Sequence, residues 1–234
     1  MNIVITGASK GIGFEAARLF AENTGNKVFA LSRNKVGLDK LEAEVNNVPF
    51  RGRIMVFPFD LVKGDIQKDL LPAIEGFIPH VDVLVNNAGL LVSKPFDQFS
   101  EEEFNLMFDA NVKSAFFLSQ ALLPLMKPGS HILNIGSMGG FQGSVKFAGL
   151  SLYSASKGAL AVLSECMAEE LKGRNISVNC LALGSAQTEM LTQAFSGYKA
   201  PLSASEMARF IVDFALSGSR WFNGKVLPVS VATP

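Results

Sequence analysis

Short apolar segments alternate with helical patterns along this chain of 234 residues. Segments 28–31 and 81–85 are almost wholly apolar, as strands buried on both faces of a parallel sheet are. The expected strands fall near 2–5, 27–32, 53–58, 82–86, 131–136, 176–182 and 225–230, and the expected helices near 12–23, 37–46, 65–77, 101–126, 152–172 and 204–217. The alternation predicts an α/β fold, a single doubly wound parallel sheet with helices on both faces, in one domain over residues 1–234.

The composition fits one well-packed domain and excludes several function classes. Hydrophobic residues make up 48% of the chain, charged residues 18%, and the formal net charge is zero. Nucleic acid and an anionic membrane surface are therefore not expected as partners. No apolar stretch reaches membrane-spanning length, and the first strand leaves no room for a leader peptide, so we expect a cytoplasmic protein. The two cysteines, Cys166 and Cys180, are expected to be reduced core residues, and the isolated His80 and His131 predict no metal site.

A strand, a glycine-rich turn and a helix start follow one another at the N-terminus. The apolar segment 2–5 leads into Thr6-Gly7-Ala8-Ser9-Lys10-Gly11-Ile12-Gly13, and a helical pattern follows. Glycines let the backbone approach phosphates, and the N–H groups at a helix start attract their charge. The spacing is not that of a P-loop, so an NTPase is not expected. The unit predicts nucleotide binding in a Rossmann-like sheet, although a plain tight turn would show the same pattern.

Tyr153 and Lys157 stand four residues apart in an expected helix. Positions i and i+4 share a helix face, so the phenol and the ammonium can point into the same space. A phenol titrates near ~10, and a neighbouring cation favours the phenolate and lowers the pKa. The pair predicts an acid/base for proton transfer to or from an oxygen while another group moves a hydride. Considered alone, Lys157 is equally explained as an exposed helix lysine.

Several motifs occur in a fixed order: Thr6-Gly7-x-x-x-Gly11-x-Gly13, Asn86-Asn87-Ala88-Gly89, Asn111, Ser137 and Tyr153-x-x-x-Lys157. Together they closely resemble the short-chain dehydrogenase/reductase family, from Met1 to about Thr188 and more weakly beyond. The resemblance implies hydride transfer between a nicotinamide cofactor and a small carbonyl compound or secondary alcohol. It implies that Ser137 holds the substrate oxygen, Tyr153 moves the proton, Lys157 lowers the tyrosine pKa and binds the nicotinamide ribose, and Asn111 anchors a water of the proton relay.

The resemblance also implies a set of cofactor-binding residues: Gly7, Ser9, Lys10, Gly11, Ile12, Gly13, Ser32, Arg33, Asp60, Leu61, Asn87, Ala88, Gly89, Tyr153, Lys157, Gly184 and Thr188. An acid after the second strand would take the ribose 2′-OH of NAD. Here Ser32 and Arg33 stand there, and with Lys10 they suit a 2′-phosphate, so NADP(H) is favoured over NAD(H). The alternatives are that Lys10 and Arg33 are solvated surface charges, that Asp60 caps the next element and that Ser137 is a turn residue.

The family pattern Pro-Gly-x-x-x-Thr reads Leu183-Gly184-Ser185-Ala186-Gln187-Thr188 here. Without the fixed φ of proline this turn is expected to be less rigid. The segment from Glu189 to about Ser203, a substrate lid in relatives, is short. Its apolar residues predict an open or shallow apolar cleft, and the loop 138–151 supplies further residues that would be wall or core. These candidates are Met190, Leu191, Phe195, Met138, Phe141, Phe147 and Leu150.

Three functions remain open from the sequence. The leading one is an NADP(H)-dependent carbonyl reductase or alcohol dehydrogenase acting on a small molecule. A 3-oxoacyl-carrier-protein reductase is weakened by a C-terminal segment, 227–234, without the expected glycine pair, and by basic residues at Lys146, Lys199 and Arg209 that are too scattered for a carrier-binding patch. A non-catalytic NADP(H)-binding sensor or scaffold would be expected to lack part of the tetrad. Relatives form dimers or tetramers, and the apolar residues of 104–126 allow a homodimer or homotetramer.

Overall fold

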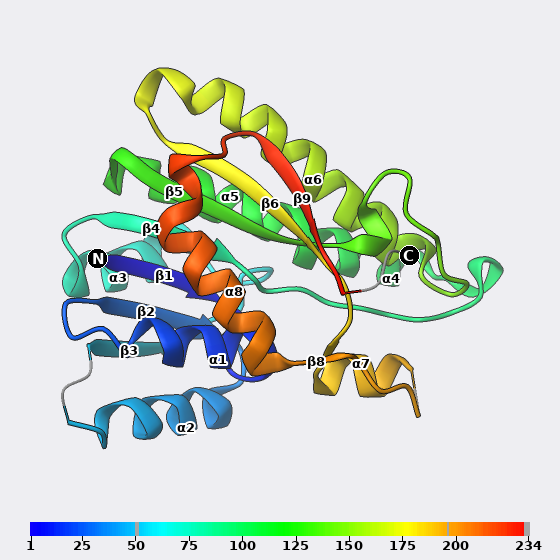
Figure 1. Ribbon diagram of the computed structural model, residues 1–234, viewed down its shortest axis with the longest axis horizontal. Coiled ribbons are helices and arrows are strands. Elements are labelled where there is room, and N and C mark those ends of the chain that lie inside the picture. The colour runs from blue at the N-terminus through cyan, green and yellow to red at the C-terminus, as the bar shows by residue number, and fades with distance from the viewer. Residues whose placement is uncertain (50–51, 196, 232–234) are drawn as a thin grey trace.

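Seven strands form one parallel sheet in the order β3-β2-β1-β4-β5-β6-β9 (Figure 1). This computed structural model describes residues 1–49, 52–195 and 197–231, so the end of the expected C-terminal segment, residues 232–234, lies outside the described residues. The strands are β1 (Asn2–Thr6), β2 (Lys27–Ser32), β3 (Arg53–Pro58), β4 (Val81–Asn86), β5 (Met126–Ser137), β6 (Ser177–Leu183) and β9 (Lys225–Val229). The order reverses between β1 and β4, which confirms the doubly wound prediction.

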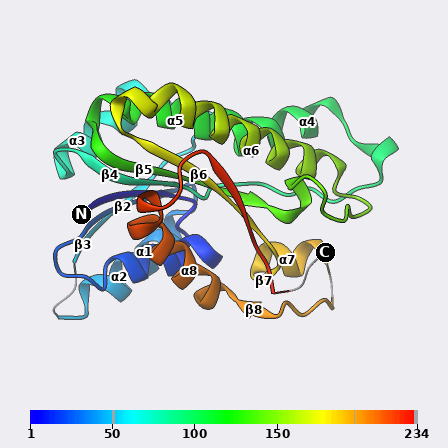
Figure 2. The same cartoon turned by 45° about the horizontal axis from the view of Figure 1, so that its top comes forward.

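Helices cover both faces of the sheet, with α1, α2 and α8 on one face and α3, α5 and α6 on the other (Figures 1 and 2). Their bounds are α1 (Gly11–Phe20), α2 (Lys35–Asn46), α3 (Leu71–Phe77), α4 (Glu101–Phe108), α5 (Ser114–Leu122), α6 (Ser151–Leu171), α7 (Glu189–Ala194) and α8 (Ala204–Ser217). Within the described ranges, no helix combines the length and apolar character needed to cross a bilayer.

Alternate residues of each central strand pack against opposite helix layers. In β1, Ile3 and Ile5 belong to the core under α1 and α8, whereas Val4 belongs to the core under α3 and α5. All three side chains are fully buried, and complete burial of such a side chain contributes about 1.5–3 kcal/mol. The almost unbroken apolar character of these strands is therefore explained by a sheet that is covered on both sides.

Polar residues mark the start of several helices. Ser100 accepts from the N–H of Glu103, whose carboxylate accepts from the N–H of Ser100, and Ser203 and Glu206 form the same reciprocal arrangement before α8. Each arrangement satisfies two N–H groups that the helix itself leaves without partners. The starts of α4 and α8, which the sequence predicts at 101 and 204, are confirmed.

The helix expected over 101–126 is present from Glu101 to Leu125, but it is not a regular α-helix throughout. After α4, a wider π-type turn covers Asp109–Lys113, α5 follows, and a short 3₁₀ turn ends at Leu125. Pro124 lies in that last turn, and because proline lacks an N–H it cannot continue the helical hydrogen bonding. The next strand therefore begins at Met126, five residues earlier than the apolar pattern indicates, and Met126 pairs with Val81.

The segment after β6 contains structure that the apolar pattern does not predict. The short strands β7 (Ala186–Gln187) and β8 (Leu202–Ser203) pair with each other, and α7 lies between them in sequence. Thr188 begins α7 by accepting a hydrogen bond from the N–H of Leu191 over 3.2 Å. The segment expected as a brief lid thus contains the helix α7, and the strands on either side of this helix pair with each other.

Candidate active site

A cleft of about 860 Å³ lies where the carboxyl ends of the strands meet. Of the residues expected in the site, all but Asn111 line this one cleft: Gly7, Ser9, Lys10, Gly11, Ile12, Gly13, Ser32, Arg33, Asp60, Leu61, Asn87, Ala88, Gly89, Ser137, Tyr153, Lys157, Gly184 and Thr188. The fold brings them together because parallel strands end at the same edge of the sheet.

Gly13 lets the glycine turn, the start of α1 and Asn87 pack closely together. A Cβ atom on Gly13 would lie 2.3 Å from the carbonyl oxygen of Gly7 and 2.3 Å from Nδ2 of Asn87, so no side chain fits there. The start of α1 has no side-chain cap and no acidic residue in its first turn. Its N–H groups, together with the positive end of the helix dipole, suit an anion such as a diphosphate.

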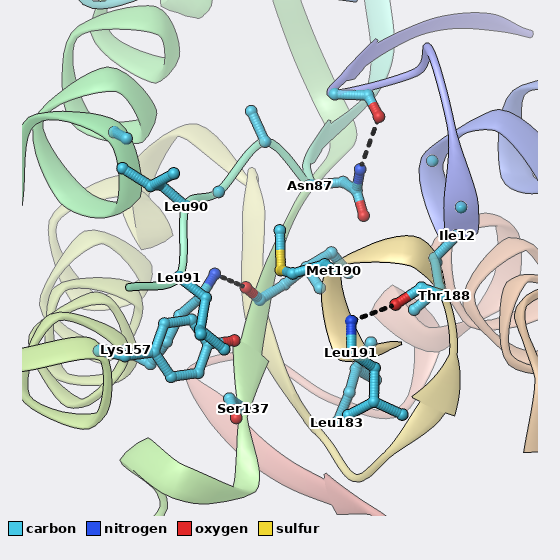
Figure 3. Close-up of a pocket in the computed structure, with 18 of the residues that line it drawn as sticks. Ile12, Asn87, Leu90, Leu91, Ser137, Lys157, Leu183, Thr188, Met190 and Leu191 are labelled. Carbon is cyan, nitrogen blue, oxygen red and sulfur yellow. Dashed lines mark hydrogen bonds between the residues drawn. The ribbon is translucent and has the colours of Figure 1, made fainter. Parts of the chain in front are cut away.

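Asn87 fastens the end of β4 to the glycine turn (Figure 3). Its Nδ2 donates to the carbonyl oxygen of Thr6 over 2.9 Å, and the Thr6 hydroxyl accepts from the N–H groups of Asn87 and Ala88 over 3.0 and 2.8 Å. The two loops that would face a bound cofactor therefore form one cross-linked unit.

Lys10 and Arg33 are exposed at the rim of the same cleft. Between them, the hydroxyl groups of Ser9 and Ser32 lie 2.8 Å apart and join the glycine turn to the end of β2. Asp60 also lines the cleft, but its carboxylate accepts from the N–H of Val62 over 2.9 Å, as a capping residue does. Two cations and two hydroxyls thus line the part of the cleft where the adenosine of the expected cofactor would lie, and β2 contributes no carboxylate there.

Lys157 is deeply buried, with 4% of its surface exposed. Its Nζ donates to the carbonyl oxygen of Ile135 on β5 over 2.8 Å and lies 5.9 Å from the ring centroid of Tyr153 (Figure 3). Burial lowers the pKa of Lys157 to about 8, because the apolar surroundings disfavour the ammonium form. The alternative of an exposed helix lysine is therefore wrong.

The Tyr153 phenol does not have the lowered pKa that the four-residue spacing predicts. Burial raises the pKa of Tyr153, and a hydrogen bond with the Ser137 side chain acts in the opposite direction with a smaller effect. The physical reason is desolvation, because burial disfavours the charged phenolate, while Nζ of Lys157 donates to the Ile135 carbonyl. Tyr153 is accordingly a protonated hydrogen-bond donor at neutral pH, with Ser137 as its neighbour at the end of β5.

Asn111 lies behind the cleft wall, not on it. The residue is buried in the π-type turn between α4 and α5. Its Oδ1 accepts from the N–H of Leu90 over 2.7 Å, and its Nδ2 donates to the Leu90 carbonyl and to the Ser156 hydroxyl, each over 2.9 Å. A Cβ atom on Gly89 would lie 3.1 Å from this Oδ1 and 3.3 Å from Nζ of Lys157, so a glycine lets both groups approach.

The rest of the cleft wall is mainly apolar. Met190, Leu191 and Phe195 line it as expected, and from the preceding loop Met138, Phe147 and Leu150 do so, whereas Phe141 does not line it. The cleft is also lined by Leu90, Leu91, Leu106, Ser185 and Tyr198, which were not expected there from the sequence. Leu90 and Leu91 directly follow the Asn-Asn-Ala-Gly motif, which was the available signal for them, and Figure 3 shows them across the cleft from Leu191. No cluster of histidine, cysteine and acidic residues that could hold a metal occurs in the described part of the chain.

Comparisons with known proteins agree with this geometry. The family model described as short chain dehydrogenase matches residues 1–199. A 3-oxoacyl-[acyl-carrier-protein] reductase of Thermotoga maritima is 32% identical over 189 residues, which cover 80% of this chain and 74% of the relative. A short chain dehydrogenase from Burkholderia cenocepacia, solved in complex with NADP, superposes with a TM-score of 0.85 at 25% identity over 97% of this chain and 95% of that chain. A 3-ketoacyl-(acyl-carrier-protein) reductase from Brucella melitensis, complexed with NADH, has the same TM-score and identity over 97% of this chain and 96% of that chain. Similar structures thus hold either nicotinamide dinucleotide.

Proposed function

The chain belongs to the short-chain dehydrogenase/reductase family, and from this membership we propose that it is an NADP(H)-dependent oxidoreductase that interconverts a small carbonyl compound and a secondary alcohol. One observation carries the proposal: Ser137, Tyr153 and Lys157 line the same cleft as the glycine turn. One domain would then carry both the cofactor site and the substrate site.

The residues present fit a nicotinamide dinucleotide phosphate. The glycine turn and the start of α1 would hold the diphosphate, while Lys10, Ser32 and Arg33 would bind the 2′-phosphate through charge-assisted hydrogen bonds. Asp60 and Leu61 would hold the adenine, and Gly184, Thr188 and the loop 87–89 would lie toward the nicotinamide. When bound, this cofactor supplies or accepts the hydride, and the protein contributes orientation and charge.

The chain's own groups would handle the substrate oxygen. In the direction of reduction, the hydroxyl of Ser137 and the phenol of Tyr153 would donate hydrogen bonds to the carbonyl oxygen, and the phenol would then transfer its proton to the developing alkoxide. The raised pKa of Tyr153 keeps that proton in place at neutral pH. The ammonium of Lys157 would stabilise the phenolate that remains and bind the ribose hydroxyls. In the direction of oxidation the phenolate would accept the proton, so higher pH would favour alcohol oxidation.

A 3-oxoacyl-carrier-protein reductase is the second candidate, supported by the 32% identity to the Thermotoga maritima reductase. It requires a basic surface for the phosphate arm of the carrier. The basic residues considered for such a surface, Lys146, Lys199 and Arg209, are scattered along the chain and none of them lines the cleft. The small-molecule reductase is therefore preferred.

We also propose a homodimer or homotetramer formed through the helices expected at 101–126 and 152–172, which correspond to α4, α5 and α6. These helices expose large apolar side chains, among them Phe104, Leu106, Phe116 and Phe117. An exposed apolar patch of this kind is typical of a surface that another protein covers. Light scattering combined with size-exclusion chromatography would measure the number of subunits.

The proposed reaction is tested by Tyr153→Phe, which removes only the phenol oxygen. Turnover of aldehydes and ketones should fall by about 10²–10⁴, while NADPH binding, followed by nicotinamide fluorescence, should stay nearly unchanged. Ala155→Ser, an exposed change on the same helix that does not line the cleft, is the matched control. Near-normal turnover in Tyr153→Phe would refute the assignment. A wild-type protein that binds NADPH tightly and reduces no carbonyl compound would instead favour the sensor or scaffold.

A further inference from the structure

Two hydroxyl groups stand together in the apolar part of the cleft wall. Oγ of Ser185 and the phenol oxygen of Tyr198 lie 3.1 Å apart, and both residues line the cleft. Ser185 follows β6, and Tyr198 follows α7, so the pair joins the sheet edge to the far side of the lid segment. Met190 and Leu191, whose side chains appear in Figure 3, belong to the same wall.

The pair keeps hydrogen-bonding capacity after its mutual bond is made. Each hydroxyl has one donor hydrogen and two acceptor lone pairs, and a single bond between the two uses one hydrogen. The other hydrogen and several lone pairs remain for a third partner. Tyr198 lines the cleft and is 50% exposed, so a molecule in the cleft can approach this residue.

Holding the lid closed does not require this pair. Gln187 already joins the two flanks of α7: its Nε2 donates to the Thr192 hydroxyl over 3.1 Å, and its Oε1 accepts from the N–H of Ala200 over 2.9 Å. The pairing of β7 with β8 adds backbone bonds across the same segment. The pair is therefore available for a further role, and its place on the cleft wall favours recognition of a ligand.

The charges around the cleft limit what that ligand is. Among the described residues that line it, the cations are Lys10 and Arg33 at the adenosine end and Lys157, which is buried against β5. The Ser185–Tyr198 pair thus provides hydroxyl groups for hydrogen bonding but no positive charge. A carboxylate or phosphate on the substrate would have no cation of the pair to bind.

We propose that the Ser185–Tyr198 pair binds a second oxygen of the substrate, and that the preferred substrate is a neutral ketone carrying a further carbonyl or hydroxyl group a few bonds from the reacting carbonyl. The inference rests on the proposed function and names the substrate class for that site. Ser185 and Tyr198 are specificity-determining residues, whereas Ser137 and Tyr153 act on the reacting oxygen.

Two ketones with chains of equal length test the inference. Ethyl 3-oxobutanoate carries a second carbonyl, and heptan-2-one has the reacting carbonyl at the same place in a chain of the same length without the second one. Tyr198→Phe and Ser185→Ala should each lower kcat/KM for the ester by about 3–10-fold, the effect of one neutral hydrogen bond, and leave the value for heptan-2-one within about twofold. The loss should appear in KM more than in kcat. Thr192→Val removes one hydrogen bond of Gln187. This variant measures how a less firmly held lid segment changes kcat/KM for each ketone.

Equal losses for both ketones, matching those of Thr192→Val, would show that the pair fastens the lid and would overturn the inference. No change with either ketone would overturn it too. A binding measurement separates this inference from the proposed reaction: calorimetric titration of each ketone into Tyr153→Phe saturated with NADPH, with and without Tyr198→Phe. Binding of the ester that depends on Tyr198 supports the pair even if the wild-type protein reduces neither ketone, a result that would refute the proposed reaction alone. Ester binding independent of Tyr198 refutes the pair.

Discussion

Asn111 and Ser156 join two helical segments that lie 45 residues apart in the sequence: Nδ2 of Asn111 donates to Oγ of Ser156 over 2.9 Å. The Ser156 hydroxyl in turn donates to the Tyr153 carbonyl over 2.8 Å. Through its other contacts Asn111 also holds both backbone groups of Leu90. One buried amide thus fixes α6, which carries Tyr153 and Lys157, against the loop that follows β4.

Replacement of this amide should affect both stability and turnover. Asn111→Ala leaves the partly buried N–H and C=O of Leu90 without their partner, so the free energy of unfolding should fall by about 1–3 kcal/mol. Turnover measured well below the unfolding transition should fall as well, because Tyr153 and Lys157 lose a positioning contact. Urea unfolding and kcat are the measurements. Asn105→Ala, at an exposed position of α4, should change neither, and an Asn111→Ala protein as stable and active as this control would contradict the prediction.

Cofactor preference should depend on Arg33. If its guanidinium binds a 2′-phosphate, Arg33→Ala should weaken NADPH binding by about tenfold or more and leave NADH binding nearly unchanged, since a hydrogen bond to a charged group contributes about 1.5–3 kcal/mol. Arg220→Ala removes the same charge from an exposed position that does not line the cleft, and it should leave both affinities unchanged. Fluorescence titrations of the wild-type protein and both variants with each cofactor measure these affinities. Equal affinity of the wild-type protein for NADPH and NADH would show that Lys10 and Arg33 are solvated surface charges.

Lys157 should cost the folded protein stability at neutral pH. Its pKa is about 8 in the folded chain, against about 10.4 in an unfolded chain. Below pH 8 the ammonium is buried at a penalty, and Lys157→Met should raise the free energy of unfolding at pH 7 by on the order of 2 kcal/mol while abolishing turnover. Between pH 8 and about 10.4 the unfolded chain binds a proton that the folded chain has released, so the wild-type stability should rise toward that of the variant. Denaturant unfolding of both proteins from pH 7 to 10 measures this convergence, and parallel curves would contradict it.

His131 should destabilise the protein in mild acid. Its Nδ1 bonds to the Ala215 carbonyl over 3.0 Å, its Nε2 contacts Nδ2 of Asn179 over 3.1 Å, and burial lowers its pKa below the ordinary 6.5. Since Nε2 accepts the hydrogen of Asn179, the neutral ring is required. As the pH falls below 6.5, the unfolded chain binds a proton that the folded chain resists, and stability declines. His131→Gln should be less stable at pH 7.5 but should lose less stability between pH 7 and 5. An unchanged decline in that variant would assign the acid sensitivity to other groups.

The local patterns of the sequence were enough to predict the sheet and the edge where ligands bind, whereas most residues of the cleft were expected from the family resemblance. Apolar runs such as Val28–Leu31 depend on burial at successive positions, and burial on both faces leaves a signature that can be read without coordinates. Gly7, Ser32, Asn87 and Ser137 could be placed at one site because each follows or ends a strand, and parallel strands end at one edge. In these cases the structural cause lies within a few residues of its effect.

The roles of other residues depend on groups far away in the chain. The pKa of Tyr153 depends on its burial and on Ser137. The position of the Lys157 ammonium depends on its hydrogen bond to the carbonyl of Ile135. Asn111 faces Leu90 and Ser156, and Tyr198 meets Ser185, because the topology brings those partners within hydrogen-bond distance. Periodicity and spacing by themselves determined the doubly wound sheet and the edge where ligands bind. Only the tertiary structure decided which polar groups are buried, paired or left available in the cleft, since desolvation and hydrogen bonding act between neighbours in space and not between neighbours in sequence.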